Sequence, residues 1–292
     1  MNVYVDHNFL IYCAKEAAWR KAVIGAHQSE RICVILSAWH FYEYGNASGH
    51  PGTEDLIKFA EELNPKWILE RGDLQQREFI AEWNNLWDGE PYGFDPICSL
   101  AEAGAALNRV SVQRMSRYTI REYVASFSAP GALDTIRAEL ERQKDVAKFN
   151  LDKYVNDKRF DAILPITQLF YVAVQIARLS EIKPDRVYAL ANELMRQQPI
   201  ATQIECFVYW KGLELLKAYL VEVALTLDLY PNKATLNVNR QVDRQHAIVA
   251  LPYCDILVTD DDDLAKRCNR VKQRLKFKTA DIITGKELID SL

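Results

Sequence analysis

Acidic residues follow short apolar segments near both ends of this chain. Residues 2–5 run into Asp6, and residues 255–258 run into the acids at 260–263. If both segments are parallel strands, their carboxyl ends lie at one edge of a sheet, where open α/β proteins bind ligands. Carboxylates gathered there repel one another, and Mg²⁺ or Mn²⁺, which prefer oxygen ligands, would relieve that repulsion. The pattern therefore predicts a metal site built from both ends of the chain.

Two further acids lie on predicted helices beside these strands. Glu43 comes one to two turns into the helix after the second predicted strand, and Asp243 opens a helix before the strand at 255–258. With Asp6 and Asp261, they could hold one or two metal ions that activate water and stabilise a phosphoryl transition state. Asp263 is a second-choice ligand. Each acid alone also fits a helix cap, a helix dipole or a solvated face, so the combination carries the prediction.

Three polar residues could support such a site. His246 lies three residues after Asp243, one helical turn away, where it could bind phosphate or transfer a proton near neutral pH. A core histidine would have the same spacing. Thr259 could orient Asp6 or a metal-bound water, and Asn8 is either a helix N-cap or a polar group of the site.

A basic strip follows the acidic loop, and it begins with Lys266, Arg267 and Arg270. Seven basic residues and no acids lie between positions 266 and 278. These residues could guide a phosphate backbone toward the metal, so RNA binding is predicted here. A solvated helix face would show the same pattern.

The element pattern predicts an α/β fold with a large insertion. Strands are expected at 2–5, 32–36, 255–258 and 281–283, with helices at 9–27, after Ser37, at 243–251 and at 262–274. Residues 51–235 show little strand signal and are predicted to be an all-helical insertion. The α/β domain is then formed by residues 1–50 and 236–292.

Composition is that of a globular protein and gives limited functional information. The chain has 292 residues, of which 49% are hydrophobic and 26% charged, and a net charge of −4. Its six cysteines form no C-x-x-C pair, which favours free thiols in a reducing cytoplasm. Asp6 and His7 interrupt any signal peptide, and charges interrupt the apolar stretch at 213–229, so we expect a cytoplasmic protein with no membrane span.

The combined pattern resembles the PIN-domain nucleases. The matching residues are Asp6 after the first strand, Ser37 and Glu43 at the second, Asp243 before the late strand, and Thr259-Asp260-Asp261-Asp262-Asp263-Leu264, which fits a T-x-D-x-x-[FL] signature. The resemblance implies a three-layer α/β/α fold with a central parallel sheet. It also implies endoribonuclease activity that depends on Mg²⁺ or Mn²⁺, and homodimers are common in that family.

The resemblance covers residues 1–45 and 240–292, about a third of the chain, and about 200 residues separate Glu43 from Asp243. Two other functions remain open. A haloacid-dehalogenase-like phosphatase also begins with a strand and an aspartate, but its D-x-D motif would need an acid where Asn8 stands. A non-catalytic PIN-like scaffold could instead bind RNA or a protein through the insertion.

Overall fold

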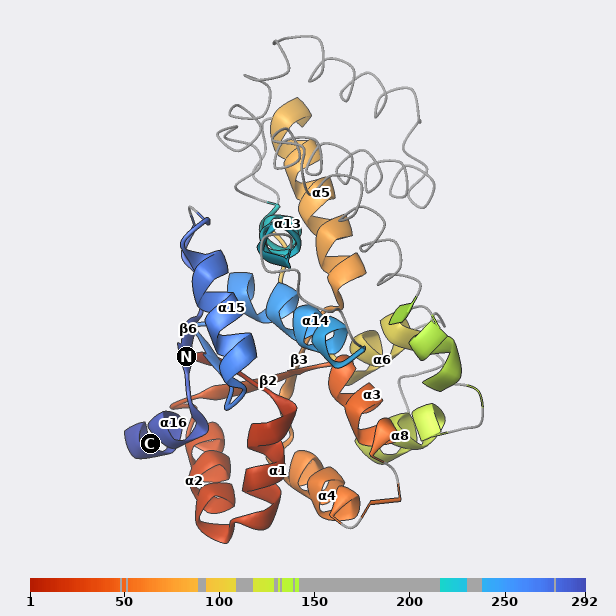
Figure 1. Ribbon diagram of the computed structural model, residues 1–292, viewed down its shortest axis with the longest axis vertical. Coiled ribbons are helices and arrows are strands. Elements are labelled where there is room, and N and C mark those ends of the chain that lie inside the picture. The colour runs from red at the N-terminus through yellow and green to blue at the C-terminus, as the bar shows by residue number, and fades with distance from the viewer. Residues whose placement is uncertain are drawn as a thin grey trace.

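The structure is a computed structural model of the whole chain. It describes residues 1–88 except 48 and 51, 93–108, 118–128, 131, 133–138, 140–141, 216–229, and 238–292 except 276. The described parts form one sheet with helices packed on both of its faces (Figure 1). In these parts, no helix combines the length and apolar character needed to cross a membrane.

Six strands form the sheet, in the order β4-β3-β2-β1-β5-β6. Their bounds are Asn2–Val5 (β1), Cys33–Ser37 (β2), Lys66–Ile68 (β3), Ile97–Cys98 (β4), Ile256–Val258 (β5) and Asp281–Ile283 (β6). Neighbouring strands run parallel, apart from β3 and β4, which are antiparallel.

The described helices connect and flank these strands. Their bounds are His7–Lys15 (α1), Ala17–Gln28 (α2), Trp39–Asn46 (α3), Thr53–Leu63 (α4), Arg71–Asp88 (α5), Leu100–Asn108 (α6), Ile120–Ser128 (α8), Lys217–Leu229 (α13), Val238–Tyr253 (α14), Asp262–Lys272 (α15) and Gly285–Ser291 (α16).

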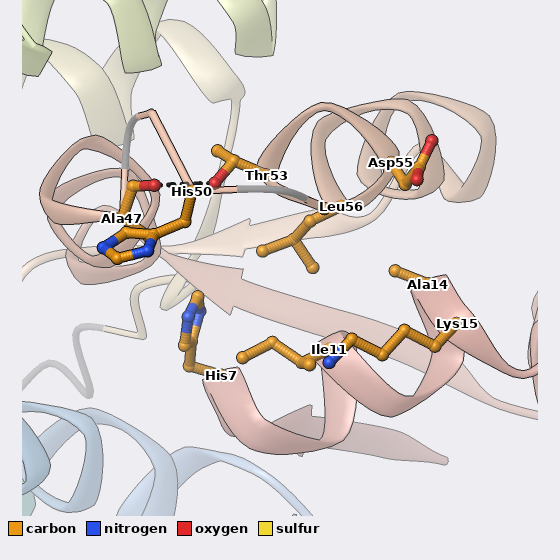
Figure 2. A pocket seen from close by; sticks show the side chains of 10 residues that line it. His7, Ile11, Ala14, Lys15, Ala47, His50, Thr53, Asp55 and Leu56 are labelled. Atoms are coloured by element: carbon orange, nitrogen blue, oxygen red, sulfur yellow. Dashed lines mark hydrogen bonds between the residues drawn. The ribbon is translucent and has the colours of Figure 1, made fainter.

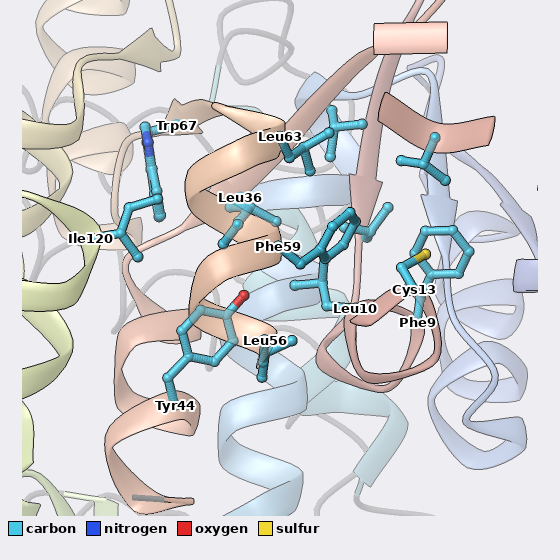
Figure 3. Close-up of a cluster of buried hydrophobic side chains, with 14 of the residues drawn as sticks. Phe9, Leu10, Cys13, Leu36, Tyr44, Leu56, Phe59, Leu63, Trp67 and Ile120 are labelled. Carbon is cyan, nitrogen blue, oxygen red and sulfur yellow. The ribbon is translucent and has the colours of Figure 1, made fainter. Parts of the chain in front are cut away.

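Side chains alternate between two hydrophobic cores, one on each face of the sheet. Val3 and Val5 of β1 point into a core formed with α1, α2, α4 and α8, part of which is seen in Figure 3. Tyr4 points the other way, into a core formed with α13, α14 and α15. Because both faces are covered, the strands read as continuous apolar runs in the sequence. The predicted α/β class is confirmed by this arrangement.

The sheet has its topological switch point at β1. The chain passes from β1 to β2 and β3 on one side, and it later returns to place β5 and β6 on the other. Val5 pairs with Val258 in register, so Asp6 and Thr259 leave the sheet side by side. Ligands of open α/β sheets bind in the crevice at such a point, outside the carboxyl ends of the strands.

The prediction that residues 51–235 are all helical is wrong at β3 and β4, which both belong to the central sheet. These strands are three and two residues long, too short to show a periodic pattern. The predicted domain boundary at residue 50 therefore falls inside the α/β domain. Most of the remaining predicted insertion, including residues 142–215 and 230–235, lies outside the described residues.

Helix boundaries also differ from the predictions. The helix expected at 9–27 is two helices, which meet at Glu16 in an extended conformation. The helix expected to start at Asp243 begins at Val238, so Asp243 lies inside it and is no cap. The α1 cap is Asp6 and not Asn8, which is exposed on the first turn.

Candidate metal centre

Asp6 is fixed by hydrogen bonds at the carboxyl end of β1. Its side chain is buried, with the residue 5% exposed, and one carboxylate oxygen accepts from the Phe9 amide at 2.9 Å as the N-cap of α1. The other oxygen accepts from the Thr259 hydroxyl at 2.5 Å. Thr259 therefore orients Asp6, as the sequence suggested. Burial raises the pKa of Asp6 to about 6, and the charges of Glu43 and Asp260 add to that effect.

Glu43 projects from α3 toward both halves of the domain. Trp39 and Tyr42 of the same helix pack with Val242 of α14, which brings α3 against that helix. As a result, the Nε2 atom of His246 lies 3.1 Å from the Oε2 atom of Glu43. Burial raises the pKa of Glu43.

A directed hydrogen-bond chain ends on the Glu43 carboxylate. An ionised carboxylate only accepts, so His246 must donate from Nε2, and its Nδ1 then accepts from the Tyr4 hydroxyl. The Tyr4 oxygen in turn lies 2.7 Å from the Ser37 hydroxyl, which can donate to it. His246 and Tyr4 are 2% and 0% exposed, so this chain lies beneath the site and orients Glu43 from within.

His246 is therefore not placed to act as the predicted phosphate ligand or proton shuttle. Both ring nitrogens have partners, and burial lowers its pKa to about 3, which keeps the ring neutral near pH 7. Both ring nitrogens of His40 also have partners: its Nδ1 accepts from the Ser37 amide at 3.0 Å, and its Nε2 lies 2.9 Å from the Val5 carbonyl oxygen. Ligand atoms of His40, Glu43 and His246 lie within 4.8 Å of one another, but these hydrogen bonds leave only Glu43 free to bind a cation.

Asp243 lies on α14 next to a buried arginine. The Nη2 atom of Arg267 is 3.2 Å from the Asp243 carboxylate. Burial raises the pKa of Asp243 to about 7, with the charges of Asp261 and Glu43 acting in the same direction and Arg267 opposing them. The charge of Glu43 also acts on Asp6, so the four predicted acids are linked electrostatically.

Asp261 and Asp263 have different surroundings. Asp261 is the N-cap of α15, and one of its carboxylate oxygens accepts from the amides of Asp263 and Leu264. Asp263 is half-exposed and pairs with Arg240 at 3.3 Å and Arg267 at 3.4 Å. Asp260 accepts from the Gly285 amide at 3.0 Å, at the start of α16. Asp261 thus fits a cation ligand better than Asp263 does.

Two of the three predicted RNA-binding residues are engaged elsewhere. Arg267 is only 6% exposed and bonds Asp243, so it cannot present its guanidinium to an RNA backbone. Arg270 makes a two-pronged contact with Asp228, at 2.8 and 2.7 Å. Lys266 is exposed on α15. The prediction for Arg267 is wrong because it shares the buried stripe of α15 with Leu264 and other apolar residues, a helical spacing present in the sequence.

Asp6, Glu43, Asp243 and Asp261 lie on neighbouring elements and affect one another's pKa, but in the described residues no three of their ligand atoms lie within 4.8 Å of one another. Oxygen donors suit a hard divalent cation, and because burial raises the pKa of Asp6, Glu43 and Asp243, such a cation would compete with protons for them. Sequence reasoning missed the Ser37–Tyr4–His246 chain, whose only signal was a tyrosine within an aliphatic strand.

Comparisons with known proteins give no match: no protein-family model, no curated protein and no solved structure is similar to this chain at a significant level.

Proposed function

We propose that this chain is a metal-dependent nuclease that hydrolyses RNA phosphodiester bonds. The observation that carries the proposal is a group of carboxylates with raised pKa values near the topological switch point: buried Asp6 and partly buried Glu43 and Asp243. Among the described residues, only Asp243 of these three has an arginine partner. Burying like charges together is unfavourable unless a cation or a proton neutralises them, and function often depends on such groups.

Carboxylate oxygens are the ligands that Mg²⁺ and Mn²⁺ prefer, and such an ion would be held by Asp6, Glu43, Asp243 and Asp261. A bound ion of this kind activates water and stabilises charge on a phosphoryl oxygen. The residues of the chain orient those ligands: Thr259 fixes Asp6, and His246 fixes Glu43. Fixed ligands need not reorganise during the reaction, which lowers its barrier. RNA as substrate rests on the resemblance to PIN-domain nucleases in Asp6, Glu43, Asp243 and the Thr259–Leu264 signature.

A cleavage assay with a matched variant tests this proposal. End-labelled single-stranded RNA of mixed sequence, and DNA of the same sequence, would be incubated with the protein in Mn²⁺, in Mg²⁺ or in EDTA. We expect cleavage of RNA that requires metal and is lost in Asp6→Asn, whose amide keeps the size and capping ability of the original side chain. Asp262→Asn, which changes an exposed acid at the start of α15, is the control and should cleave like wild type.

Two outcomes would contradict the proposal. Cleavage retained in a folded Asp6→Asn protein would mean that the activity comes from another site or a contaminant. No cleavage in any metal, with RNA still bound, would favour the non-catalytic scaffold.

A further inference from the structure

A pocket lies beside the candidate metal centre, between α1 and α4. Its volume is about 430 Å³, within the range of about 300–1,000 Å³ typical of small-molecule sites. In Figure 2, Ile11, Ala14 and Lys15 line it from α1, and Leu56 lines it from α4. The imidazole rings of His7 and His50 lie at one end. The pocket is thus mostly apolar, with polar groups at its ends.

His7 connects this pocket to the metal centre. It follows Asp6 directly, and its Nδ1 atom lies 3.9 Å from the Glu43 carboxylate. The same atom is buried and has no hydrogen-bond partner. A polar atom in that state is unfavourable unless a ligand or water satisfies it. A molecule bound in the pocket would contact the His7 ring, which also lies next to Glu43.

The lining fits a flat, partly polar ring. Ile11 and Ala14 face Leu56 across the space, so aliphatic side chains can contact both faces of such a ring. The imidazoles of His7 and His50 can stack on it or bond to its edge, as aromatic side chains do with unpaired RNA bases. At the rim, Lys15 could attract a neighbouring phosphate, and the carboxylate of Asp55 could accept a hydrogen bond from an exocyclic amino group.

We propose that this pocket binds one unpaired nucleobase next to the scissile phosphate. The inference rests on the proposed nuclease function, because the metal centre fixes where the phosphate would lie. A base stacked within a duplex cannot enter the pocket without leaving its partner, which disfavours double-stranded substrates.

The test measures binding separately from cleavage. A fluorescently labelled single-stranded RNA would be bound in Ca²⁺, which takes the same kind of oxygen ligands, and followed by anisotropy. A series of RNAs carries one abasic site at successive positions. For wild type, we expect one position at which base removal weakens binding about tenfold, as for loss of one stacked base. The corresponding RNA duplex should bind more weakly than the single strand.

Ala14→Phe fills the pocket, and Ala18→Phe adds the same ring at an exposed position on α2 outside it. We expect Ala14→Phe to weaken binding of intact RNA by about the same factor as base removal, with no further loss for the abasic RNA. Ala18→Phe should bind like wild type. If Ala14→Phe does not fold, His50→Ala, in the exposed turn before α4, should also reduce the preference for the intact base.

Equal binding of all abasic RNAs by wild type would overturn the inference. So would an Ala14→Phe protein in which base removal weakens binding further, by the same factor as in wild type. These results are distinct from failure of the proposed function. If the protein distinguishes the abasic position but cleaves no RNA in Mn²⁺, the pocket binds a base and the proposed nuclease function is wrong. If it cleaves RNA but binds all abasic RNAs equally, the nuclease function holds and the base pocket is wrong.

Discussion

The His246 ring donates a hydrogen bond to Glu43 across the interface between α14 and α3, over a distance of 3.1 Å. The two residues are 203 positions apart. Behind His246 the chain of hydrogen bonds continues through Tyr4 of β1 to Ser37 at the end of β2. Four elements therefore cooperate to set the direction of one carboxylate. Partners behind a metal ligand commonly have this function, since they fix the ligand and tune its basicity.

His246 should act as a positioning residue for the metal. We expect His246→Ala to weaken Mn²⁺ binding by about 10- to 100-fold, the usual effect of losing a partner behind a ligand. His246→Gln, which keeps an N–H donor, should recover part of that affinity. Titration calorimetry with Mn²⁺ gives the numbers, and His27→Ala on α2 is the control. Unchanged affinity in a folded His246→Ala protein would show that the contact is structural only.

Metal binding should depend on pH because the ligands carry protons at low pH. Burial raises the pKa of Asp6 to about 6 and that of Asp243 to about 7. A cation must displace these protons, so affinity for Mn²⁺ should rise as the pH increases from about 5 to 8 and then level off. Calorimetry at pH 6 in buffers of different ionisation enthalpy should show proton release on binding. Binding at pH 6 without proton release would contradict these pKa directions.

Asp6→Asn should stabilise the metal-free protein at high pH. The pKa of Asp6 is raised from 3.8 to about 6 in the folded state. The folded protein therefore gains stability from the neutral Asp6 carboxyl below pH 3.8, and this stability is lost as the pH rises through 6. Two pKa units correspond to about 3 kcal/mol, so we expect a gain of about 1–3 kcal/mol in the free energy of unfolding at pH 8.

Urea unfolding in EDTA measures this gain, and the same variant at pH 3.5 is the internal control. Asparagine can still cap α1, and the Thr259 hydroxyl can turn to accept from the new amide. No gain in stability is expected at pH 3.5, because the wild-type Asp6 carboxyl is already neutral there in the folded protein. A loss of stability at pH 8 would mean that the hydrogen bonds of Asp6 outweigh its burial.

The sequence predicts the strands and acids of the edge where β1 and β5 meet. Both faces of these strands are buried, so their apolar runs are clear. Asp6 follows β1 directly, and Asp261 comes three residues after the end of β5. The rest depends on contacts between distant residues. Nothing near Tyr4 in the sequence indicates that His246 will lie against it, and β3 and β4 become strands by pairing with the sheet.

Asp261 and Asp263 provide a comparison between two neighbouring acids. The charge of Asp261 raises the pKa of Asp243, which places Asp261 near the candidate metal centre, whereas Asp263 is half-exposed and pairs with Arg240 and Arg267. We expect Asp261→Asn to weaken Mn²⁺ binding at least tenfold, by loss of a charged ligand. Asp263→Asn should have little effect, because an exposed charge is screened by salt.

The same pair of variants tests the electrostatic link to Asp243. Removing the Asp261 charge should lower the pKa of Asp243, so that proton release on metal binding shifts to lower pH. Asparagine at 261 still caps α15, so the helix should remain folded, which circular dichroism would verify. Equal losses of Mn²⁺ affinity in the two variants would contradict the prediction, because they would mean that Asp263 contributes to metal binding as much as Asp261 does.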